Sequence, residues 1–422
     1  MLPGQPDERG AMNTARPYIP GSGTVADQAL SLRLDRRKQL QIWWREIDRV
    51  LLALIAVLAV CGVIAVALAS PASANRLSTD AVELSDWHFF ELHLGWLALG
   101  TGVLLGTSML PLEKARRAGI LVAGAMLAAL VLVPFIGVER NGAVRWLYFG
   151  FTMQPSEFLK PAFAITLAWI LSWKQRDPSL PVIGFSAGLL GLIIALLMLQ
   201  PNLGEAILFA GCWFVLVVLA GLPLRNVGIL TGIAGALGLL AYLFYDNARN
   251  RIDAFFSGGT AYDHVDLARR TMMDGGWTGK GPWLGQEKMR LPEAHTDYIL
   301  SVVGEELGLA VCGLLVLLYL AIVLRVAVRL LDEERLFIVL SASGLVALFG
   351  GQAFINILVN LQLFPSKGMT LPMISYGGSS LIAQCFAIGL LLAITRRNPY
   401  LARGTYDFGS ADERTDQAKG RP

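Results

Sequence analysis

Long apolar stretches alternate with short polar segments along most of this chain. A helix needs about 20 predominantly apolar residues to cross the roughly 30 Å hydrocarbon core of a bilayer. Ten stretches approach that length, near residues 50–69, 92–110, 118–136, 158–173, 181–199, 203–222, 226–245, 301–324, 336–358 and 378–395. The period-two alternation typical of strands is absent. The pattern therefore predicts an all-α polytopic membrane protein with about ten transmembrane helices.

The composition supports a membrane protein and excludes several soluble classes. Hydrophobic residues make up 55% of the 422 residues and charged residues 16%, against about 25% charged residues in an ordinary soluble domain. The formal net charge of +3 is too small to indicate a polyanionic partner, so no nucleic acid is expected. The four cysteines lie inside apolar runs without CxxC spacing, which predicts neither a disulfide framework nor a zinc site.

Lysine and arginine gather in alternate loops, and this pattern predicts the orientation. Segments 111–117, 174–176, 325–335 and 396–403 are rich in these residues, whereas 70–91 and 200–202 are poor in them. Because basic loops stay on the cytoplasmic side, both termini are predicted to be cytoplasmic. We expect a largely disordered cytoplasmic tail over 1–48, a ten-span membrane domain over 49–397 and a C-terminal cytoplasmic tail over 398–422.

The opposite face carries three longer connections, 137–157, 246–300 and 359–377. The large loop 246–300 lies between spans seven and eight, and loops of that length usually have a function. Segment 359–377 is apolar, but its prolines and glycines forbid a continuous helix. We expect it to be a re-entrant segment that other parts of the protein shield from lipid. A functional site is therefore predicted to face outward.

The first charged cluster includes Arg145, Glu157 and Lys160. Glu157 and Lys160 are three residues apart, so they share one face of a helix. An ionisable pair so close to hydrocarbon is costly, which makes it a functional candidate. A helix-start ion pair with no further role is the alternative. A later turn, QPNLGE over 200–205, places Glu205 at the start of span six.

The long outer loop ends in AHTDYILSVVGEELG, residues 294–308, which contains His295, Asp297, Glu305 and Glu306. Asp297 falls where the loop is predicted to become helix, and a helix N-terminus favours the carboxylate form. A general base must be ionised before it accepts a proton. An N-cap role and a general-base role for Asp297 are therefore compatible.

The predicted re-entrant segment and the residues after it contain Lys367, Ser375 and Ser379. Lys367 is a lone cation in apolar surroundings, and a lysine whose ammonium reaches back to the interface is the alternative to a binding role. The sequence has no Walker A motif. ATP-driven transport is therefore not predicted.

Four motifs resemble, in order, those of the SEDS family (shape, elongation, division and sporulation proteins). They are QPSEFLKP at 154–161, QPNLG at 200–204, AHTDYILSVVGEELG at 294–308 and PSKGMTLPMISYGGSS at 365–380. The resemblance extends over about residues 45–397, and KGMTLP before SYGGSS resembles the cell-division branch more than the rod-elongation branch. It implies a peptidoglycan glycosyltransferase at the division septum of the bacterial plasma membrane. Such an enzyme polymerises lipid II on the outer face into β-1,4-linked strands, with inversion and release of undecaprenyl pyrophosphate.

The resemblance also implies roles for individual residues. Asp297 matches the family's essential aspartate and is predicted to be the general base. The outer-side cations predicted to bind the pyrophosphate of lipid II are Arg145, Lys160 and Lys367. Supporting roles are predicted for Glu157, Glu305, Glu306, His295, Ser375 and Ser379. No protein metal site and no certain cofactor are predicted, although a divalent cation, Mg²⁺ or Mn²⁺, would suit a pyrophosphate leaving group. The implied partners are lipid II, the nascent glycan strand, a class B penicillin-binding transpeptidase and other divisome membrane proteins.

Two alternatives from other functional classes compete with an enzyme. One is a flippase for lipid II, which needs a hydrophilic path to both membrane faces, whereas the distinctive residues here gather outside. The other is a non-catalytic scaffold for a transpeptidase. The sequence also departs from the family pattern at Asn202, where an acid is common, and at Asp266, where an amide is expected. The first departure argues against a catalytic role for the 200–205 turn.

Overall fold

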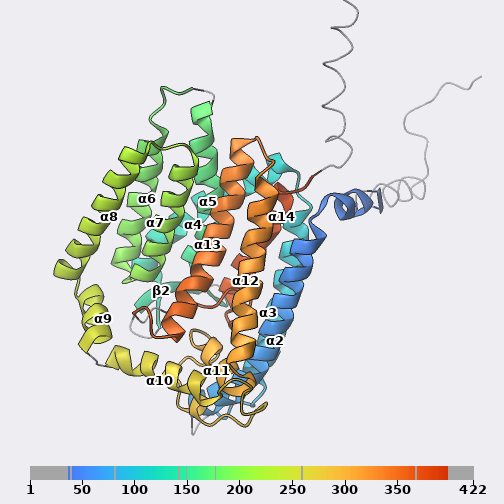
Figure 1. The fold of residues 1–422 in the computed structure, drawn as a ribbon, viewed down its shortest axis with the longest axis vertical. Helices are drawn as coiled ribbons and strands as arrows, with labels where there is room; N and C mark the ends of the chain where they lie inside the picture. The colour runs from blue at the N-terminus through green and yellow to red at the C-terminus, as the bar shows by residue number, and fades with distance from the viewer. Residues whose placement is uncertain are drawn as a thin grey trace, which may run out of the picture. The chain divides into compact units, whose positions relative to one another are not determined.

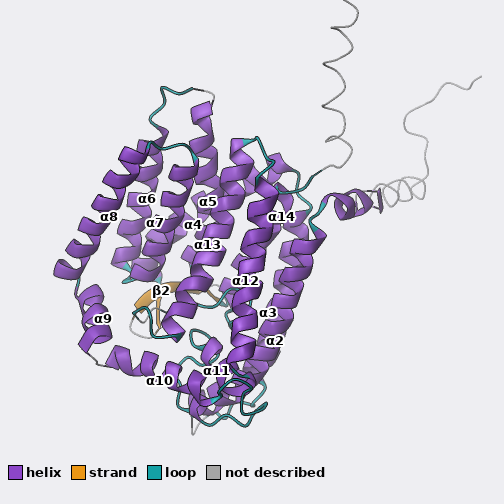
Figure 2. Ribbon diagram, viewed as in Figure 1, coloured by secondary structure: helices purple, strands orange, loops and turns teal. Residues whose placement is uncertain are grey.

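The computed structural model describes residues 37–38, 40–79, 82–140, 143–148, 150–175, 177–257, 260–365 and 368–397. The chain divides into two units, residues 1–46 and residues 47–422. In the first unit, the described residues 41–46 are helical. The second unit is a helix bundle with a small sheet (Figure 1, Figure 2).

Ten helices of the second unit correspond to the ten apolar stretches. They are α2 (Arg49–Leu77), α3 (His88–Ser108), α4 (Leu112–Ile136), α5 (Pro155–Ser172), α6 (Val182–Leu199), α7 (Leu203–Leu219), α8 (Leu224–Phe244), α12 (Leu309–Leu330), α13 (Leu336–Asn360) and α14 (Gly378–Ile394). A short 3₁₀ helix, η1 (Trp173–Gln175), follows α5. Within the described part of the chain, seven helices are long and apolar enough to cross a membrane, and α7 and α14 are apolar but shorter. The all-α polytopic class is confirmed, while the number of spans stays a prediction.

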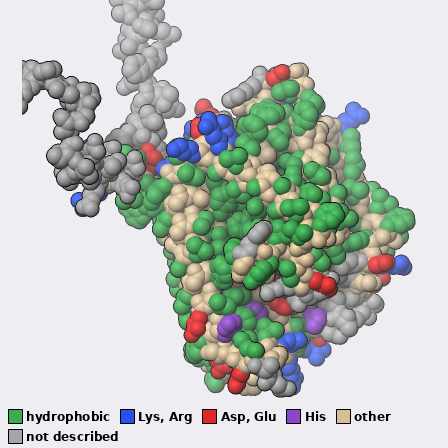
Figure 3. Space-filling model, turned by 180° about the vertical axis from the view of Figure 1, so that it is seen from behind, with side chains coloured by type: hydrophobic (Ala, Val, Ile, Leu, Met, Phe, Trp, Pro, Cys, Tyr) green, Lys and Arg blue, Asp and Glu red, His purple; other side chains and the backbone are tan. Residues whose placement is uncertain are grey.

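The outside of the bundle is apolar around its middle. Large side chains near the middle of their helices, such as Leu192, Leu237 and Leu317, are exposed there. Figure 3 shows hydrophobic side chains over the middle of one face, with most charged side chains toward the two ends. A soluble protein rarely exposes so much contiguous apolar surface, so this belt is the surface that lipid would cover.

Several of the basic loops meet at one end of the bundle. Arg329 of α12 pairs with Asp48 at 3.0 Å, next to the start of α2, and donates a hydrogen bond to the carbonyl of Thr395 after α14 (3.0 Å). Arg396 donates to the carbonyl of Leu110, between α3 and α4 (2.6 Å). These segments lie together, as the predicted alternation of loops requires. That this end faces the cytoplasm stays a prediction.

The opposite end carries the sheet and the short helices (Figure 1). Strands β1 (Val138–Arg140), β2 (Ala143–Tyr148) and β3 (Thr152–Met153) form an antiparallel sheet in the order β1-β2-β3. The long connection after α8 contains α9 (Asp246–Ser257), α10 (Thr260–Asp274), the 3₁₀ helix η2 (Glu287–Met289) and α11 (Ile299–Leu307). The two long connections 137–157 and 246–300 are therefore structured caps on this end of the bundle.

The predicted span 301–324 is wrong at its start. The chain forms α11 and then α12, with Gly308 between them at φ +90°. A side chain at Gly308 would collide with the carbonyl oxygen of Trp277. The backbone N–H of Leu309 instead donates to the carbonyl of Gly276 (2.9 Å). The long outer loop thus docks at this point and breaks the helix, although the apolar pattern continues through it.

Helix α5 lies among α4, α7, α13 and α14, which enclose most of its length. Most of its residues from Pro155 to Ala168 are buried, including the charged Glu157 and Lys160. The first turn of α5 follows β3 directly, at the end that carries the sheet. The fold therefore holds two ionisable side chains inside the bundle, close to the end where the cap lies.

Helices α3 and α14 approach each other closely through small residues. A Cβ atom added to Gly100 would lie 2.8 Å from Sγ of Cys385, and one added to Gly389 would overlap the hydroxyl of Thr107. Small residues allow such close backbone packing between helices in a membrane. Helix α14 is thereby packed tightly against α3.

Candidate active site

Asp297 lies in the turn 292–298, which precedes α11 at the capped end of the bundle. The N-cap residue of α11 is Tyr298, so the N-cap role considered for Asp297 is wrong. The backbone carbonyl of Asp297 accepts hydrogen bonds from Nδ2 of Asn356 (2.8 Å) and of Asn360 (3.1 Å), both on α13. These amides hold the backbone of Asp297 in place, so the carboxylate side chain extends from a fixed Cα atom.

The segment 368–376 is attached to the same turn. Oγ of Ser375 donates to the carbonyl of Thr296 (2.5 Å), and the backbone N–H of Tyr376 donates to the carbonyl of His295 (2.9 Å). A Cβ atom added to Gly368 would lie 3.1 Å from Oδ2 of Asp297. The structure thus brings the last outer segment against the catalytic candidate, and Ser375 fastens it there.

A cavity of about 460 Å³ opens beside Asp297. It is lined by Ser73, Arg76, Leu77, His264, Leu291, Pro292, Glu293, His295, Asp297 and Tyr298. Arg76, at the end of α2, is exposed and was not predicted as a site residue. Its one signal in the sequence is that it is the only basic residue of segment 70–91. The cavity therefore combines carboxylates with a guanidinium group.

His295 is buried in the wall of this cavity. Its ring lies 4.3 Å from that of Phe89 and 5.3 Å from that of Tyr376, measured between centroids. Burial lowers the pKa of His295 to about 4, although the negative charge of Glu293 acts in the opposite direction. The imidazole is therefore neutral near pH 7, and it supplies aromatic packing rather than positive charge.

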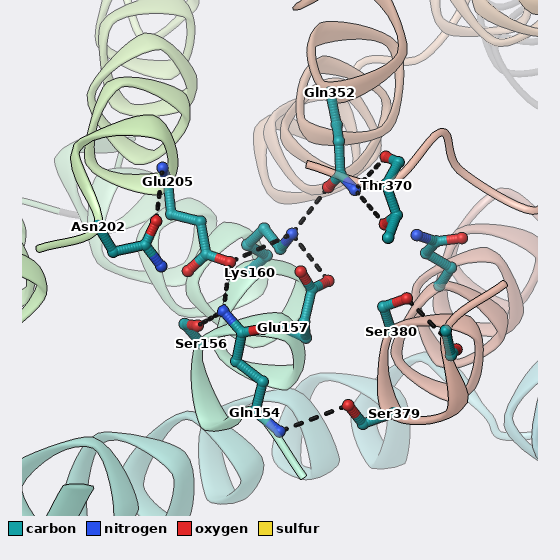
Figure 4. A network of polar contacts seen from close by, with 12 residues as sticks. Gln154, Ser156, Glu157, Lys160, Asn202, Glu205, Gln352, Thr370, Ser379 and Ser380 are labelled. Carbon is teal, nitrogen blue, oxygen red and sulfur yellow. Dashed lines mark hydrogen bonds and ion pairs between the residues drawn. The ribbon is translucent and has the colours of Figure 1, made fainter. Parts of the chain in front are cut away.

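Lys160 occupies a second polar cluster, inside the bundle (Figure 4). Its Nζ atom lies 2.8 Å from Oε2 of Glu157, 4.0 Å from Oε1 of Glu205 and 2.7 Å from Oε1 of Gln352. The predicted shared face of Glu157 and Lys160 is confirmed by this ion pair. All three charged side chains are buried. The lysine is thus held by an ion pair with Glu157 beside a second buried carboxylate, and the spacing alone did not reveal this second carboxylate.

Further bonds join this cluster to neighbouring elements. Nε2 of Gln154 donates to Oε1 of Glu205 (3.0 Å). The backbone N–H of Gln154 donates to Oγ of Ser379 on α14 (3.4 Å). Nε2 of Gln352 donates to the carbonyl of Thr370 (2.9 Å). Helices α5, α7, α13 and α14 and the segment 368–376 therefore converge on one polar network. Gln352 and Thr370 were not predicted because nothing in their local sequence marks them.

Arg145 lies on β2 rather than in the wall of the cavity beside Asp297. Its Nε atom donates to the carbonyl of Gln200 (3.1 Å) and its Nη2 atom to that of Pro201 (2.6 Å). The side chain therefore anchors the sheet to the turn between α6 and α7. Lys367, the third predicted cation, lies outside the described residues.

Glu305 and Glu306 fasten the long outer loop to α11. Glu305 accepts hydrogen bonds from the backbone N–H groups of Glu287 (2.8 Å) and Lys288 (2.9 Å). Glu306 pairs with the ammonium group of Lys288 at 2.5 Å. Lys288 was not predicted, since a single lysine in a glycine-rich loop gives no signal. These carboxylates support the loop that carries Asp297, and they do not line the cavity beside it.

A resident metal ion would need several ligands in one place. Over the ranges that the structure describes, no three His, Cys, Asp or Glu side chains are grouped so that they could hold one. Magnesium, however, often uses only one or two carboxylates together with substrate phosphates. Asp297 and Glu293 are the carboxylates that the cavity offers to such an ion.

Comparison with known proteins gives consistent matches. A family model described as a cell cycle protein, covering FtsW, RodA and SpoVE, matches residues 48–400. The chain is 37% identical over 381 residues to the probable peptidoglycan glycosyltransferase FtsW of Caulobacter vibrioides, spanning 89% of this chain and 96% of that protein. It is 36% identical over 370 residues to the corresponding protein of Geobacter metallireducens, spanning 84% and 96%.

Solved structures show the same architecture. A chain from a peptidoglycan synthase complex that coordinates polymerization and crosslinking aligns with a TM-score of 0.66 and 27% identity, covering 83% of this chain and 97% of that one. The rod shape determining protein RodA of Thermus thermophilus aligns with a TM-score of 0.61 and 28% identity, with the same coverage.

Proposed function

The chain belongs to the cell cycle protein family of FtsW, RodA and SpoVE, and from that membership we propose that Asp297 is the general base of lipid II polymerisation. Its relatives are named as peptidoglycan glycosyltransferases, and the chain is a peptidoglycan glycosyltransferase in a multi-span membrane fold. The observation that supports the role of Asp297 is its fixed position in the wall of a cavity of about 460 Å³.

The reaction needs a base at that position. In lipid II the reacting sugar is carried on a pyrophosphate, and the 4-hydroxyl of the acceptor displaces this group with inversion. The base removes the hydroxyl proton as the new glycosidic bond forms, which typically contributes a factor of about 10²–10⁴ to the rate. Asp297 accepts this proton in our proposal, while Asn356 and Asn360 keep its backbone from shifting.

The leaving pyrophosphate needs positive charge. Among the predicted cations, Lys160 and Arg145 are engaged with partners inside the protein. Arg76 lines the cavity with Asp297; its exposed guanidinium donates from Nη1 to the carbonyl of Arg290 (3.0 Å), and we assign it to the pyrophosphate because of its place in the cavity wall. Lys367, the residue before Gly368 in the sequence, stays the second candidate for this role.

The setting of the reaction follows from the same proposal. We place the enzyme in the bacterial plasma membrane at the division septum, with the cap and its cavity on the outer face. The partner we propose is a class B penicillin-binding transpeptidase, together with other divisome membrane proteins. A structural relative that comes from a synthase complex supports such a partner.

The experiment that tests this function is glycan polymerisation by purified protein. Lipid II, the cognate transpeptidase and moenomycin, which silences polymerases of the other class, are mixed with wild type or with Asp297→Asn. We expect wild type to form polymer and Asp297→Asn to be slower by a factor of about 10²–10⁴, because the proton acceptor is lost. The matched control is Asp266→Asn, which alters an exposed ion pair with Arg270 (2.6 Å) on α10 and should keep wild-type activity.

Thermal melts establish that the variants are folded. Equal polymer from wild type and Asp297→Asn would remove Asp297 from the mechanism and leave the enzyme in place. No polymer from either protein, with the complex intact, would instead favour the flippase or the scaffold.

A further inference from the structure

Helix α2 contains Pro71 in its last turns, at the capped end of the bundle, and continues to Leu77. Proline has no N–H, so the carbonyl of Ala67 loses its usual helical partner, and the ring disturbs the turn before it. Nε1 of Trp283 donates to the carbonyl of Ala67 (3.3 Å), and Nζ of Lys288 donates to that of Leu68 (2.9 Å). The proline therefore creates the attachment point at which the long outer loop is bound to α2.

A second cavity, of about 430 Å³, lies at this attachment point. Two indole rings form part of its wall. Trp87 and Trp283 meet edge to face, with centroids 6.0 Å apart and planes at 72°. They remain 42% and 51% exposed, so their ring faces are open to a ligand.

The polar groups of this cavity suit hydroxyl and amide groups rather than phosphate. The ammonium group of Lys288 is used by Glu306 and by the carbonyl of Leu68, so it offers little charge to an anion. The exposed carboxylate of Asp86 and amide of Gln286 also line the cavity, and neither side chain is bonded within the described part of the chain. Aromatic faces beside hydrogen-bonding groups of this kind suit an uncharged sugar ring.

The two cavities are lined by nearby positions of the same two segments. Along α2, Pro71 lines the second cavity and Ser73 lines the first, roughly 3 Å apart in helical rise but on different faces of the helix. In the outer loop, Met289 lines the second and Leu291 the first. A chain that leaves the cavity beside Asp297 would have to pass around α2 along the outer loop to reach the second cavity.

We propose that the Trp87–Trp283 cavity binds a sugar unit of the growing glycan strand. The proposal rests on the function proposed above and adds to it a binding site for the glycan product. Tryptophans at a membrane interface commonly face lipid headgroups without binding a ligand. Here, however, the N–H of Trp283 is fixed on the backbone of α2, and its ring stands against Trp87 in a cavity wall.

The test measures sugar binding separately from catalysis. The probe is the β-1,4-linked tetramer of N-acetylglucosamine, which carries neither lipid nor pyrophosphate. It is titrated against the intact purified protein by saturation-transfer NMR. We expect Trp87→Ala to bind the tetramer about tenfold more weakly than wild type, a change of about 1.4 kcal/mol.

The matched control is Trp277→Ala, an exposed tryptophan of the same outer loop that does not line this cavity. Its tetramer affinity should equal that of wild type. Because Trp283 also fastens the loop, Trp283→Phe is used beside Trp283→Ala, and melts verify folding. The phenylalanine variant keeps an aromatic face and should retain more affinity than the alanine variant.

Two results would overturn the sugar site. One is equal tetramer affinity in wild type and in a folded Trp87→Ala. The other is loss of transpeptidase binding in Trp87→Ala with unchanged tetramer affinity, which would make the surface a protein contact. Polymer formation by wild type without any tetramer binding would reject the sugar site and leave the proposed function standing. Tryptophan-dependent binding without polymerisation would support the sugar site and reject the proposed function.

Discussion

Lys160 forms an ion pair with Glu157 and lies near a second carboxylate, that of Glu205, inside the bundle. Its side chain is 5% exposed, and those of Glu157 and Glu205 are 9% and 4% exposed. Removing one partner from a buried ion pair leaves an uncompensated charge, which costs about 3–5 kcal/mol. Replacing all the partners by neutral groups avoids that cost. Breaking the cluster at one residue should therefore destabilise the protein more than replacing the whole cluster does.

Lys160→Met should lower the free energy of unfolding by about 3–5 kcal/mol, because both carboxylates would lose their cation. Thermal melts in detergent measure the change. The triple variant Glu157→Gln, Lys160→Met and Glu205→Gln is the control, and it should recover most of the lost stability. A melt of Lys160→Met that equals wild type would mean that the carboxylates already carry protons.

His295 should make the protein less stable in mild acid. Burial lowers its pKa to about 4 from an ordinary value of 6.5. Between these two pH values the unfolded chain binds a proton that the folded chain does not, so stability falls as the pH drops through this window. His295→Phe removes this effect. Melting temperatures from pH 7 to pH 5 should therefore fall more steeply for wild type than for the variant, and parallel curves would contradict the prediction.

At the scale of residues, the sequence predicted contacts only where both partners are close along the chain. Glu157 and Lys160 are three positions apart, and helical geometry was enough to pair them. Gln352, which also binds Lys160, is 192 residues away, so no local pattern could indicate it. The contacts of Lys288 could not be predicted for the same reason, because its partners lie on α2 and α11. The role of Asp297 came from the motif around it.

At the scale of elements, the junction between α11 and α12 shows how a loop overrides an apolar pattern. The residues after Gly308 are apolar, and those before it are helical and buried although they include Glu305 and Glu306. The backbone carbonyls of Gly276 and Trp277 accept hydrogen bonds from the N–H groups of Leu309 and Ala310, respectively. Sequence periodicity located all ten long helices, but it could not locate a break made by residues about 30 positions earlier.

Gly308→Ala should therefore be strongly destabilising. The residue adopts φ +90°, and a Cβ atom would lie 2.5 Å from the backbone nitrogen of Gly279. The positive φ alone costs about 1 kcal/mol in a residue other than glycine, and the steric overlap adds to it. Thermal melts and limited proteolysis of the outer loop measure the effect.

The control for Gly308→Ala is Gly313→Ala, one turn later in α12, where nothing lies within 4 Å of an added Cβ atom. Alanine is preferred over glycine inside a helix by about 1 kcal/mol, so this variant should be unchanged or slightly more stable. Equal melts for the two variants would show that the outer loop does not dock at the break.

At the scale of the whole molecule, the two ends of the bundle have different characters. One end collects several of the basic loops, and the other carries the sheet, the short helices and both cavities. The hydrophobic pattern and the charge of the loops predicted this division. They could not predict which helices are neighbours, because the apolar surfaces that meet in the bundle look alike in sequence. The close contact of α3 with α14 is an example.

Cysteine labelling tests the orientation of the bundle. Met273, on α10, is 56% exposed, and Leu331, after α12, is 80% exposed. In a variant with Cys61 replaced by alanine, Met273→Cys should react with a membrane-impermeant maleimide on spheroplasts. Leu331→Cys should react only after the membrane is opened, because the basic end is predicted to face the cytoplasm. The reverse pattern would place the cavities inside the cell.

The attachment of the Asp297 turn to later parts of the chain has a consequence for biogenesis. The turn is held by Asn356, Asn360 and Ser375, and α14 then closes against α3. A ribosome makes all these residues after Asp297, so the reaction cavity cannot be complete until nearly the whole membrane domain has been inserted. Chains released before α14 would carry the aspartate without its support. We therefore expect chains truncated before α14 to lack polymerisation activity even when they are inserted in the membrane.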